Sequence, residues 1–400
     1  PHFRVIAPLP RRGPRHRGRN QAAVMIRTGL CALLAISPIL AFHSPAPLTP
    51  PGLRKGGSSS LSTRRHVSAA ARPLRMTAPV ILEQTTLDNL MRPVIGAEAT
   101  QTWEWEGHQI RYASAGLGGS KSPAVLVHGF GSSADTWRNQ FDALAAAGHP
   151  VYAIDLLGFG GSEKPVEAEY SIDLWARQVL DFTDQVVGKG AILFGNSIGS
   201  LVSCTAAADS QRRGNVEGLV LMNCAAGMNN KFILTDTKTS AVGKAVGGVV
   251  FGILDFLLGQ EAFADWFFAR TKTEDNVSQV LRNVYVNQEA VDKDLVMSIL
   301  NPADDPNAQK VFVKILTGDP GTTPDVFMDE IKQPMLLVWG DTDPFTPLQS
   351  GYGPYFAVEL VEQRPGTELA VVNAGHCPHD DDPEGVNEAV VGWLGRLAAK

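Results

Sequence analysis

The sequence is poor in cysteine, and its first 82 residues contain no acidic side chain. Of the four cysteines, the three that follow this stretch are Cys204, Cys224 and Cys377, an odd number at wide spacings. This distribution implies neither a disulfide framework nor a metal site. Long apolar runs are also missing from the start of the chain, because residues 30–40 are too few to span a bilayer and Pro38 interrupts them.

Charge divides the chain into two parts. Residues 1–82 carry thirteen Lys and Arg, whereas the remainder carries 22 basic and 41 acidic residues. The split indicates a targeting segment attached to an acidic enzyme. An acidic body argues against nucleic acid as a partner, because nucleic-acid binding needs a basic surface. A hydrophobic content of 44% over 400 residues allows a large core and two or three domains.

The basic part, residues 1–78, has the pattern of a targeting leader. The chain does not begin with Met, and Met25 is a candidate start. Residues 25–41 have the charged, apolar and small-residue regions of a signal peptide, and residues 42–78 have the Ser, Ala and Arg content of a transit peptide. Together with Phe42 they resemble the bipartite presequence of algae with complex plastids, which implies a plastid location. The alternative is an ordinary secretory signal followed by a disordered linker.

A G-x-S-x-G motif follows a short apolar run in the middle of the chain. Residues 191–194 predict a buried parallel strand, and residues 198–208 predict a helix. A serine between a strand and a helix, with glycines on both sides, is typical of the nucleophile elbow of hydrolases. We therefore predict that Ser197 is the nucleophile.

The rest of the body alternates strands and helices, which predicts a parallel sheet covered by helices on both faces. A hairpin is expected over residues 103–113. Further strands are expected at 124–127, 151–154, 216–222, 335–339 and 368–372, and helices at 134–147, 172–187 (capped by Ser171) and 383–397. Residues 227–331 contain no clear strand, so we expect them to form a helical cap inserted into a core made of residues 79–226 and 332–400.

Two candidate partners of the serine follow the last two predicted strands. Asp343 follows residues 335–339, and His376 follows residues 368–372. The chain order Ser, Asp, His is the order of this class of hydrolase. The imidazole would take the proton of Ser197 while the carboxylate fixes its tautomer. Asp341 and His379 are close alternatives, and motif position favours Asp343 and His376.

A glycine-rich turn after the strand at 124–127 is the candidate oxyanion site. Backbone N–H groups of Phe130 and Ile198 are expected to bind the oxyanion. The turn and the elbow are expected to be supported by His128, Gly129, Gly131 and Asn196. We expect a structural role for His128, and no cofactor or metal.

The same turn permits a different interpretation. Residues 129–134 satisfy G-x-G-x-x-G/A, and Asp155 ends the next strand, where a ribose-binding acid would lie in a dinucleotide site. That interpretation leaves Ser197, Asp343 and His376 unexplained. A non-catalytic binding protein on the same fold is a third class.

These motifs resemble an α/β-hydrolase over most of residues 100–398. Residues 151–165, 195–201, 221–230, 315–318 and 375–378 more specifically resemble the chloroplast chlorophyll dephytylases, relatives of pheophytinase. The resemblance implies cleavage of the phytyl ester of chlorophyll or of its magnesium-free form. Hydrolysis of another lipophilic ester in the plastid is the alternative. Haloalkane dehalogenases and many epoxide hydrolases share the frame, but they would have Asp where Ser197 stands.

Residues 245–258 form an unusually apolar helical segment. Such a helix must be covered by protein, lipid or ligand. Either it packs against the core, or one side lines an apolar route from a lipid surface to Ser197, with peripheral contact to the thylakoid membrane.

Overall fold

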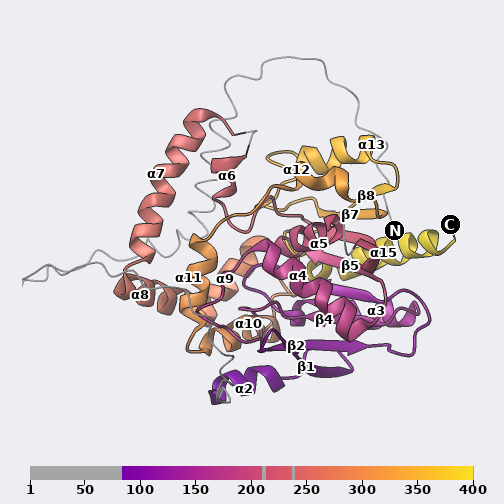
Figure 1. Ribbon diagram of the computed structural model, residues 1–400, viewed down its shortest axis with the longest axis horizontal. Helices are drawn as coiled ribbons and strands as arrows, with labels where there is room; N and C mark the ends of the chain where they lie inside the picture. Colours follow the sequence, from indigo (N-terminus) through magenta and orange to yellow (C-terminus); the bar gives the residue numbers. More distant parts are fainter. Residues whose placement is uncertain (1–82, 210–212, 237–238, 400) are drawn as a thin grey trace, which may run out of the picture.

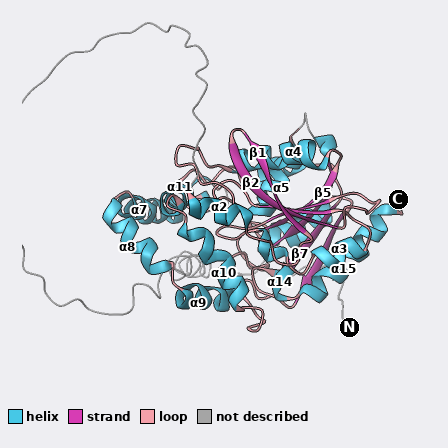
Figure 2. Cartoon of the chain, turned by 90° about the horizontal axis from the view of Figure 1, so that it is seen from below, coloured by secondary structure: helices cyan, strands magenta, loops and turns pink. Residues whose placement is uncertain are grey.

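A computed structural model describes residues 83–209, 213–236 and 239–399 of the chain (Figure 1). The expected leader, residues 1–78, lies outside these ranges. The described chain forms one eight-stranded sheet with helices on both faces, which confirms the predicted fold class (Figure 2).

The sheet has the strand order β1-β2-β4-β3-β5-β6-β7-β8. β1 and β2 form the predicted hairpin, β2 pairs antiparallel with β4, and the remaining pairings are parallel. The carboxyl ends of β3 to β8 therefore meet at one edge. The strands are β1 (Ala99–Trp105), β2 (His108–Ala115), β3 (Ala124–Val127), β4 (Val151–Ile154), β5 (Ala191–Asn196), β6 (Val216–Met222), β7 (Met335–Gly340) and β8 (Thr367–Val372).

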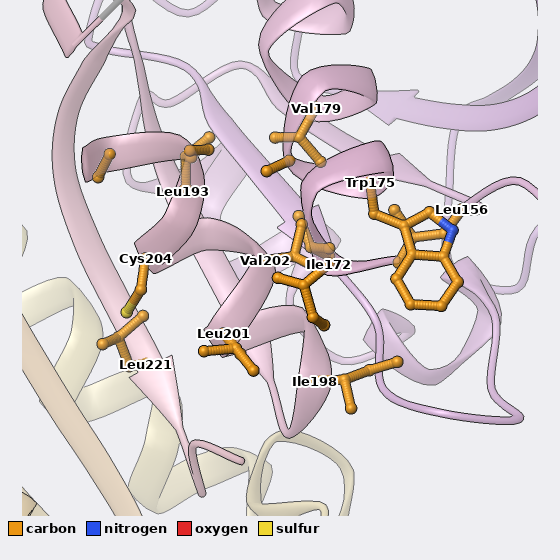
Figure 3. Close-up of a cluster of buried hydrophobic side chains, with 14 of the residues drawn as sticks. Leu156, Ile172, Trp175, Val179, Leu193, Ile198, Leu201, Val202, Cys204 and Leu221 are labelled. Atoms are coloured by element: carbon orange, nitrogen blue, oxygen red, sulfur yellow. The ribbon is translucent and has the colours of Figure 1, made fainter. Parts of the chain in front are cut away.

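The central strand β5 is buried on both faces, as its apolar sequence predicts. Leu193 joins the cluster beneath α4 (Ile172–Phe182) and α5 (Ile198–Ala208), where Trp175 and Leu201 also lie (Figure 3). Ile192 and Phe194 join the opposite cluster, beneath α3 (Phe141–Ala146) and α15 (Pro383–Ala398). The alternation follows the two-residue period of a strand.

The described residues between β6 and β7 contain helices and turns but no strand. The helices are α6 (Phe232–Thr235), α7 (Ala241–Leu258), α8 (Glu261–Thr271), α9 (Glu274–Val284), α10 (Lys293–Leu300), α11 (Ala308–Thr317) and α12 (Pro324–Phe327). α7 and α8 lie at the end of the molecule away from the sheet in both views (Figures 1 and 2). Outside this interval, α2 (Gln84–Met91), α13 (Val361–Gln363) and α14 (Pro378–Asp381) complete the α-helices of the described chain.

The prediction of one continuous helix at residues 134–147 is wrong. The chain forms a 3-10 turn at Ala134–Trp137 and then α3. The side chains of residues 138–140, between these two elements, bind the distant helix α14. Arg138 and Asn139 bind the Asp380 carboxylate, and Gln140 donates to the carbonyl of His379. These long-range hydrogen bonds explain why the helix is interrupted.

Packing of the apolar segment against the core, one of the two alternatives, is also wrong. Within α7 only Gly247 and Leu258 are buried. Nine of its eighteen residues are exposed, and Val242, Val249 and Phe256 are among them.

Candidate active site

Ser197 lies at a sharp turn between β5 and α5. Its φ of 56° and ψ of −119° are unusual for a residue with a side chain. The glycines on either side make the turn feasible, because a Cβ at Gly195 would lie 2.3 Å from the Ser200 nitrogen and one at Gly199 would lie 2.2 Å from the Val127 oxygen. The turn lifts the hydroxyl of Ser197 to the carboxyl edge of the sheet.

The structure brings Ser197, His376 and Asp343 together in a hydrogen-bonded chain. Nε2 of His376 lies 2.9 Å from Oγ of Ser197, and Nδ1 lies 2.9 Å from Oδ2 of Asp343. An ionised carboxylate can only accept, so Nδ1 carries the proton and Nε2 accepts from the serine hydroxyl. This arrangement allows His376 to act as a general base toward Ser197.

The carboxylate of Asp343 is buried and held by several donors. It accepts from Asn223 Nδ2 at 2.5 Å, from the Phe345 amide at 2.8 Å and from the Thr346 hydroxyl. Burial by itself would raise the pKa of Asp343, but His376 and the hydrogen bonds from Thr346 and Asn223 hold it well below its usual range. The alternative carboxylate, Asp341, is exposed on the preceding turn.

Asn223 is a site residue that sequence reasoning missed. It follows β6 and adopts a positive φ of 47°. Its amide nitrogen donates to Asp343, and its amide oxygen accepts from the Gly340 backbone at 3.1 Å. Its position in the sequence could have identified it. A polar residue at the carboxyl end of a buried parallel strand lies at the same edge of the sheet as Ser197.

The alternative histidine, His379, lies outside this chain of hydrogen bonds. It stacks on Trp137 with ring centroids 4.1 Å apart, and its ring nitrogens have no hydrogen-bond partner among the described residues. Burial lowers the pKa of His379 to about 3, which keeps the ring neutral.

The predicted oxyanion turn lies beside the elbow. A Cβ at Gly129 would lie 3.3 Å from the Cβ of Ser197, and Gly131 has a φ of 68°. Ile198 begins α5, so its N–H has no partner within the helix. Within the described residues, the amide of Phe130 also makes no hydrogen bond. Both predicted donors are therefore free for an oxyanion.

Two further predicted residues support this turn. Buried His128 donates from Nδ1 to the Gly129 carbonyl at 2.8 Å and accepts at Nε2 from the Leu156 amide at 3.1 Å. Burial lowers the pKa of His128, consistent with a neutral ring. Asn196 donates to the His376 carbonyl at 3.0 Å and so ties the elbow to the histidine loop.

The dinucleotide interpretation fails at Asp155. Its buried carboxylate accepts from Arg111 Nε at 2.6 Å, from the Ala134 amide at 2.6 Å and from the Gly161 amide at 2.7 Å. These internal donors occupy the oxygens that a ribose would need. Asp155 instead joins β4 to the turn that follows β3.

Aromatic side chains contact one another near the predicted oxyanion turn and the histidine. Phe130 contacts Phe159 and Phe312, with ring centroids 5.7 and 5.6 Å apart, and Phe312 contacts Phe268 at 5.8 Å. Phe345 packs edge-on against His376, with ring centroids 5.0 Å apart. Such surroundings favour an apolar substrate.

The loop that carries His376 is fastened to the helices between β6 and β7. The His376 amide donates to the Val284 carbonyl at 2.9 Å. Asp381 accepts from the amides of Gly375, Val286 and Asn287 at 2.6 to 2.9 Å. The position of the histidine therefore depends on the helical segment as well as on the sheet.

No group of three or more His, Cys, Asp or Glu side chains in the described ranges is arranged to hold a metal ion.

A model of the alpha/beta hydrolase family matches residues 124–389. The chain is 28% identical over 297 residues to a 2-hydroxy-6-oxononadienedioate/2-hydroxy-6-oxononatrienedioate hydrolase of Paraburkholderia phymatum, covering 72% of this chain and 93% of that protein. It is 23% identical over 334 residues to the chloroplastic pheophytinase of Arabidopsis thaliana, covering 74% and 66% of the two chains. Among solved structures, a bacterial membrane phospholipase A aligns with a TM-score of 0.56 and 22% identity, covering 76% and 88%.

Proposed function

The chain belongs to the alpha/beta hydrolase family, and from this premise we propose that it is a serine carboxylic-ester hydrolase that removes phytol from chlorophyll or pheophytin. The hydrogen-bonded chain from Ser197 through His376 to Asp343 carries the proposal. The similarity to pheophytinase and the aromatic surroundings of the serine support the choice of a lipophilic ester.

The reaction would proceed in two halves. Ser197 Oγ attacks the ester carbonyl while Nε2 of His376 takes its proton, and the amides of Phe130 and Ile198 bind the negative oxygen. The protonated imidazole then gives its proton to the departing phytol oxygen. Water, deprotonated by His376, releases the acid from the serine and restores the enzyme.

The apolar alcohol offers a source of selectivity. A phytyl chain has about twenty carbons, and each buried CH₂ contributes roughly 0.8 kcal/mol. Burial of half the chain would therefore supply several kcal/mol that a short acyl ester lacks. The aromatic contacts from Phe130 through Phe312 to Phe268 provide a surface of this kind.

A carbon–carbon bond hydrolase is the second candidate, because the identity to the dienedioate hydrolase, 28%, exceeds the 23% to pheophytinase. A dioate carries two carboxylates and would need cationic partners near Ser197. The ring contacts at Phe130 and Phe345 fit a dianion poorly.

The test is to incubate the chain separately with chlorophyll a, pheophytin a, p-nitrophenyl butyrate and the dienedioate. Release of phytol by the wild type and its loss in Ser197→Ala would support the proposal. Turnover of the dienedioate without release of phytol would overturn it in favour of the second candidate. Turnover of only the short ester would leave a general esterase and contradict the phytyl specificity.

A further inference from the structure

One side of α7 is a row of exposed apolar side chains. Val242, Val246, Val249, Ile253 and Phe256 are each 57 to 74% exposed. Their spacing of four and three residues places them along a single face of the helix. We call these five residues the α7 face.

The α7 face carries no charge. Lys244 and Asp255 are the charged residues of α7, and both lie away from the face, half-buried. Asp255 is paired with Lys231 of the preceding segment at 2.7 Å. Trp266 of α8, 47% exposed, adds an aromatic ring beyond the end of the helix that carries Phe256. A tryptophan beside an uncharged apolar helix face is typical of a protein that lies in a membrane interface.

The opposite side of α7 is attached to protein. Leu258 is buried with Phe267, Leu254 packs against the same cluster, and a Cβ at Gly247 would lie 3.0 Å from Ile233. In length and composition α7 could cross a bilayer. Its attached side makes an orientation parallel to the membrane surface the consistent one.

The α7 face is too small to form a stable interface with a second copy of the chain by itself. An 18-residue helix is about 27 Å long and about 10 Å wide, so one side offers on the order of 300 Å². A stable protein interface needs about 800 Å² from each partner. A lipid surface has no such minimum, because each apolar side chain that enters it contributes separately.

The protein-attached side of α7, opposite the α7 face, is connected to the candidate active site. Leu254 and Leu258 of α7 belong to the cluster that includes Phe312 of α11. Phe312 contacts Phe130, whose amide is a candidate oxyanion donor. Apolar side chains thus extend from α7 to the turn beside Ser197.

We propose that the α7 face and Trp266 seat the protein on the surface of a lipid bilayer. A lipophilic ester then passes from the bilayer along the α7, Phe312 and Phe130 contacts to Ser197, a step that rests on the proposed function. Binding to the bilayer itself does not require that function.

The experiment is flotation of the full chain with neutral phosphatidylcholine vesicles, which minimises attraction through its basic residues. We compare the wild type with the double variant Val249→Asp/Ile253→Asp. The matched control is Val326→Asp on α12, because Val326 is 68% exposed and Val249 is 65% exposed. We expect the double variant to lower the vesicle-bound fraction at least tenfold and Val326→Asp to leave it unchanged. All variants should keep wild-type turnover of a soluble short ester, which shows that they fold.

Other results would overturn the proposal. Equal flotation of the wild type and the double variant would show that the α7 face does not bind lipid. Failure of the wild type to float would do the same, as would a wild-type dimer in light scattering that the double variant dissociates. Ser197→Ala should float like the wild type, so loss of ester hydrolysis and loss of lipid binding are measured separately.

Discussion

At the residue scale, Ser197, His376 and Asp343 form one hydrogen-bonded unit, and their substitution should behave accordingly. Ser197→Ala should lower kcat for ester hydrolysis by about a thousandfold or more without changing the melting temperature. His376→Ala should lower kcat by a similar factor, because removal of either member disables the unit. Steady-state kinetics on purified variants measures both effects. A severe loss in His379→Ala with normal activity in His376→Ala would contradict the assignment.

Asn223 is expected to act through Asp343. Asn223→Gly keeps the positive φ that this position requires and removes the amide that donates to the carboxylate. We expect kcat to fall about tenfold or more while KM changes little, because the loss affects the orientation of His376 and not substrate contacts. Asn223→Ala should also lower the melting temperature, since alanine disfavours the positive φ. An unchanged kcat in the glycine variant would argue against a positioning role.

His379 should make the folded state sensitive to acid. Its pKa is about 3 in the folded protein and about 6.5 in the unfolded chain, so below pH 6.5 the unfolded state binds the extra proton. Stability should therefore be retained above pH 6.5 and lost as the pH falls toward 3, by about 2 to 3 kcal/mol between pH 6 and pH 4. Urea unfolding at several pH values measures this slope. His379→Phe keeps a ring against Trp137 and should have a flatter slope; an identical slope would exclude His379 as the cause.

Sequence reasoning selected Ser197, His376 and Asp343 as candidates because each follows a buried strand in a characteristic order. It chose between Asp341 and Asp343, and between His376 and His379, on motif position. In the structure His376 contacts Ser197, and Asp343 contacts His376. Asn223 was not predicted, because its partner Asp343 lies 120 residues further along the chain. No local pattern records that contact.

At the scale of single elements, replacing Gly199 or Gly248 by alanine should change the stability of the protein in opposite directions. Gly199 in the elbow has no room for a Cβ, whereas Gly248 on α7 has nothing within 4 Å of that position. Gly199→Ala should destabilise the protein by several kcal/mol, because backbone atoms would have to move. Gly248→Ala should stabilise it by about 0.5 to 1 kcal/mol, because alanine is the better helix former. Thermal unfolding measures both, and destabilisation by Gly248→Ala would show that α7 packs more closely than described.

Elements governed by local sequence were predicted well, and those governed by distant contacts were not. The strands at 124–127, 151–154 and 216–222 have the predicted bounds because each is a short apolar run between turns. The helix at 134–147 was wrong because Arg138 and Asn139 bind Asp380, which follows more than 200 residues later. The sequence did not decide whether α7 is buried or exposed, because the spacing of apolar residues does not show what covers an apolar helix.

At the scale of the whole molecule, we propose that the predicted leader, residues 1–78, directs the protein to a plastid. Residues 25–41 fused to a fluorescent protein should direct it into the secretory route, and residues 25–78 should direct it into a plastid. Phe42→Ala in the longer fusion should block plastid entry, which microscopy in an alga with complex plastids can measure. Secretion of both fusions regardless of Phe42 would leave the ordinary secretory signal as the correct interpretation.

The order of the strands has a consequence for biosynthesis. His376 follows Ser197 by 179 residues, and all the helices between β6 and β7 are made in the interval. At roughly 5 to 20 residues per second, a ribosome needs about 10 to 35 s to travel from the codon of the serine to that of the histidine. A nascent chain therefore holds its nucleophile without its base until the helical segment has been made. The hydrogen-bonded chain of Ser197, His376 and Asp343 can form only after that interval.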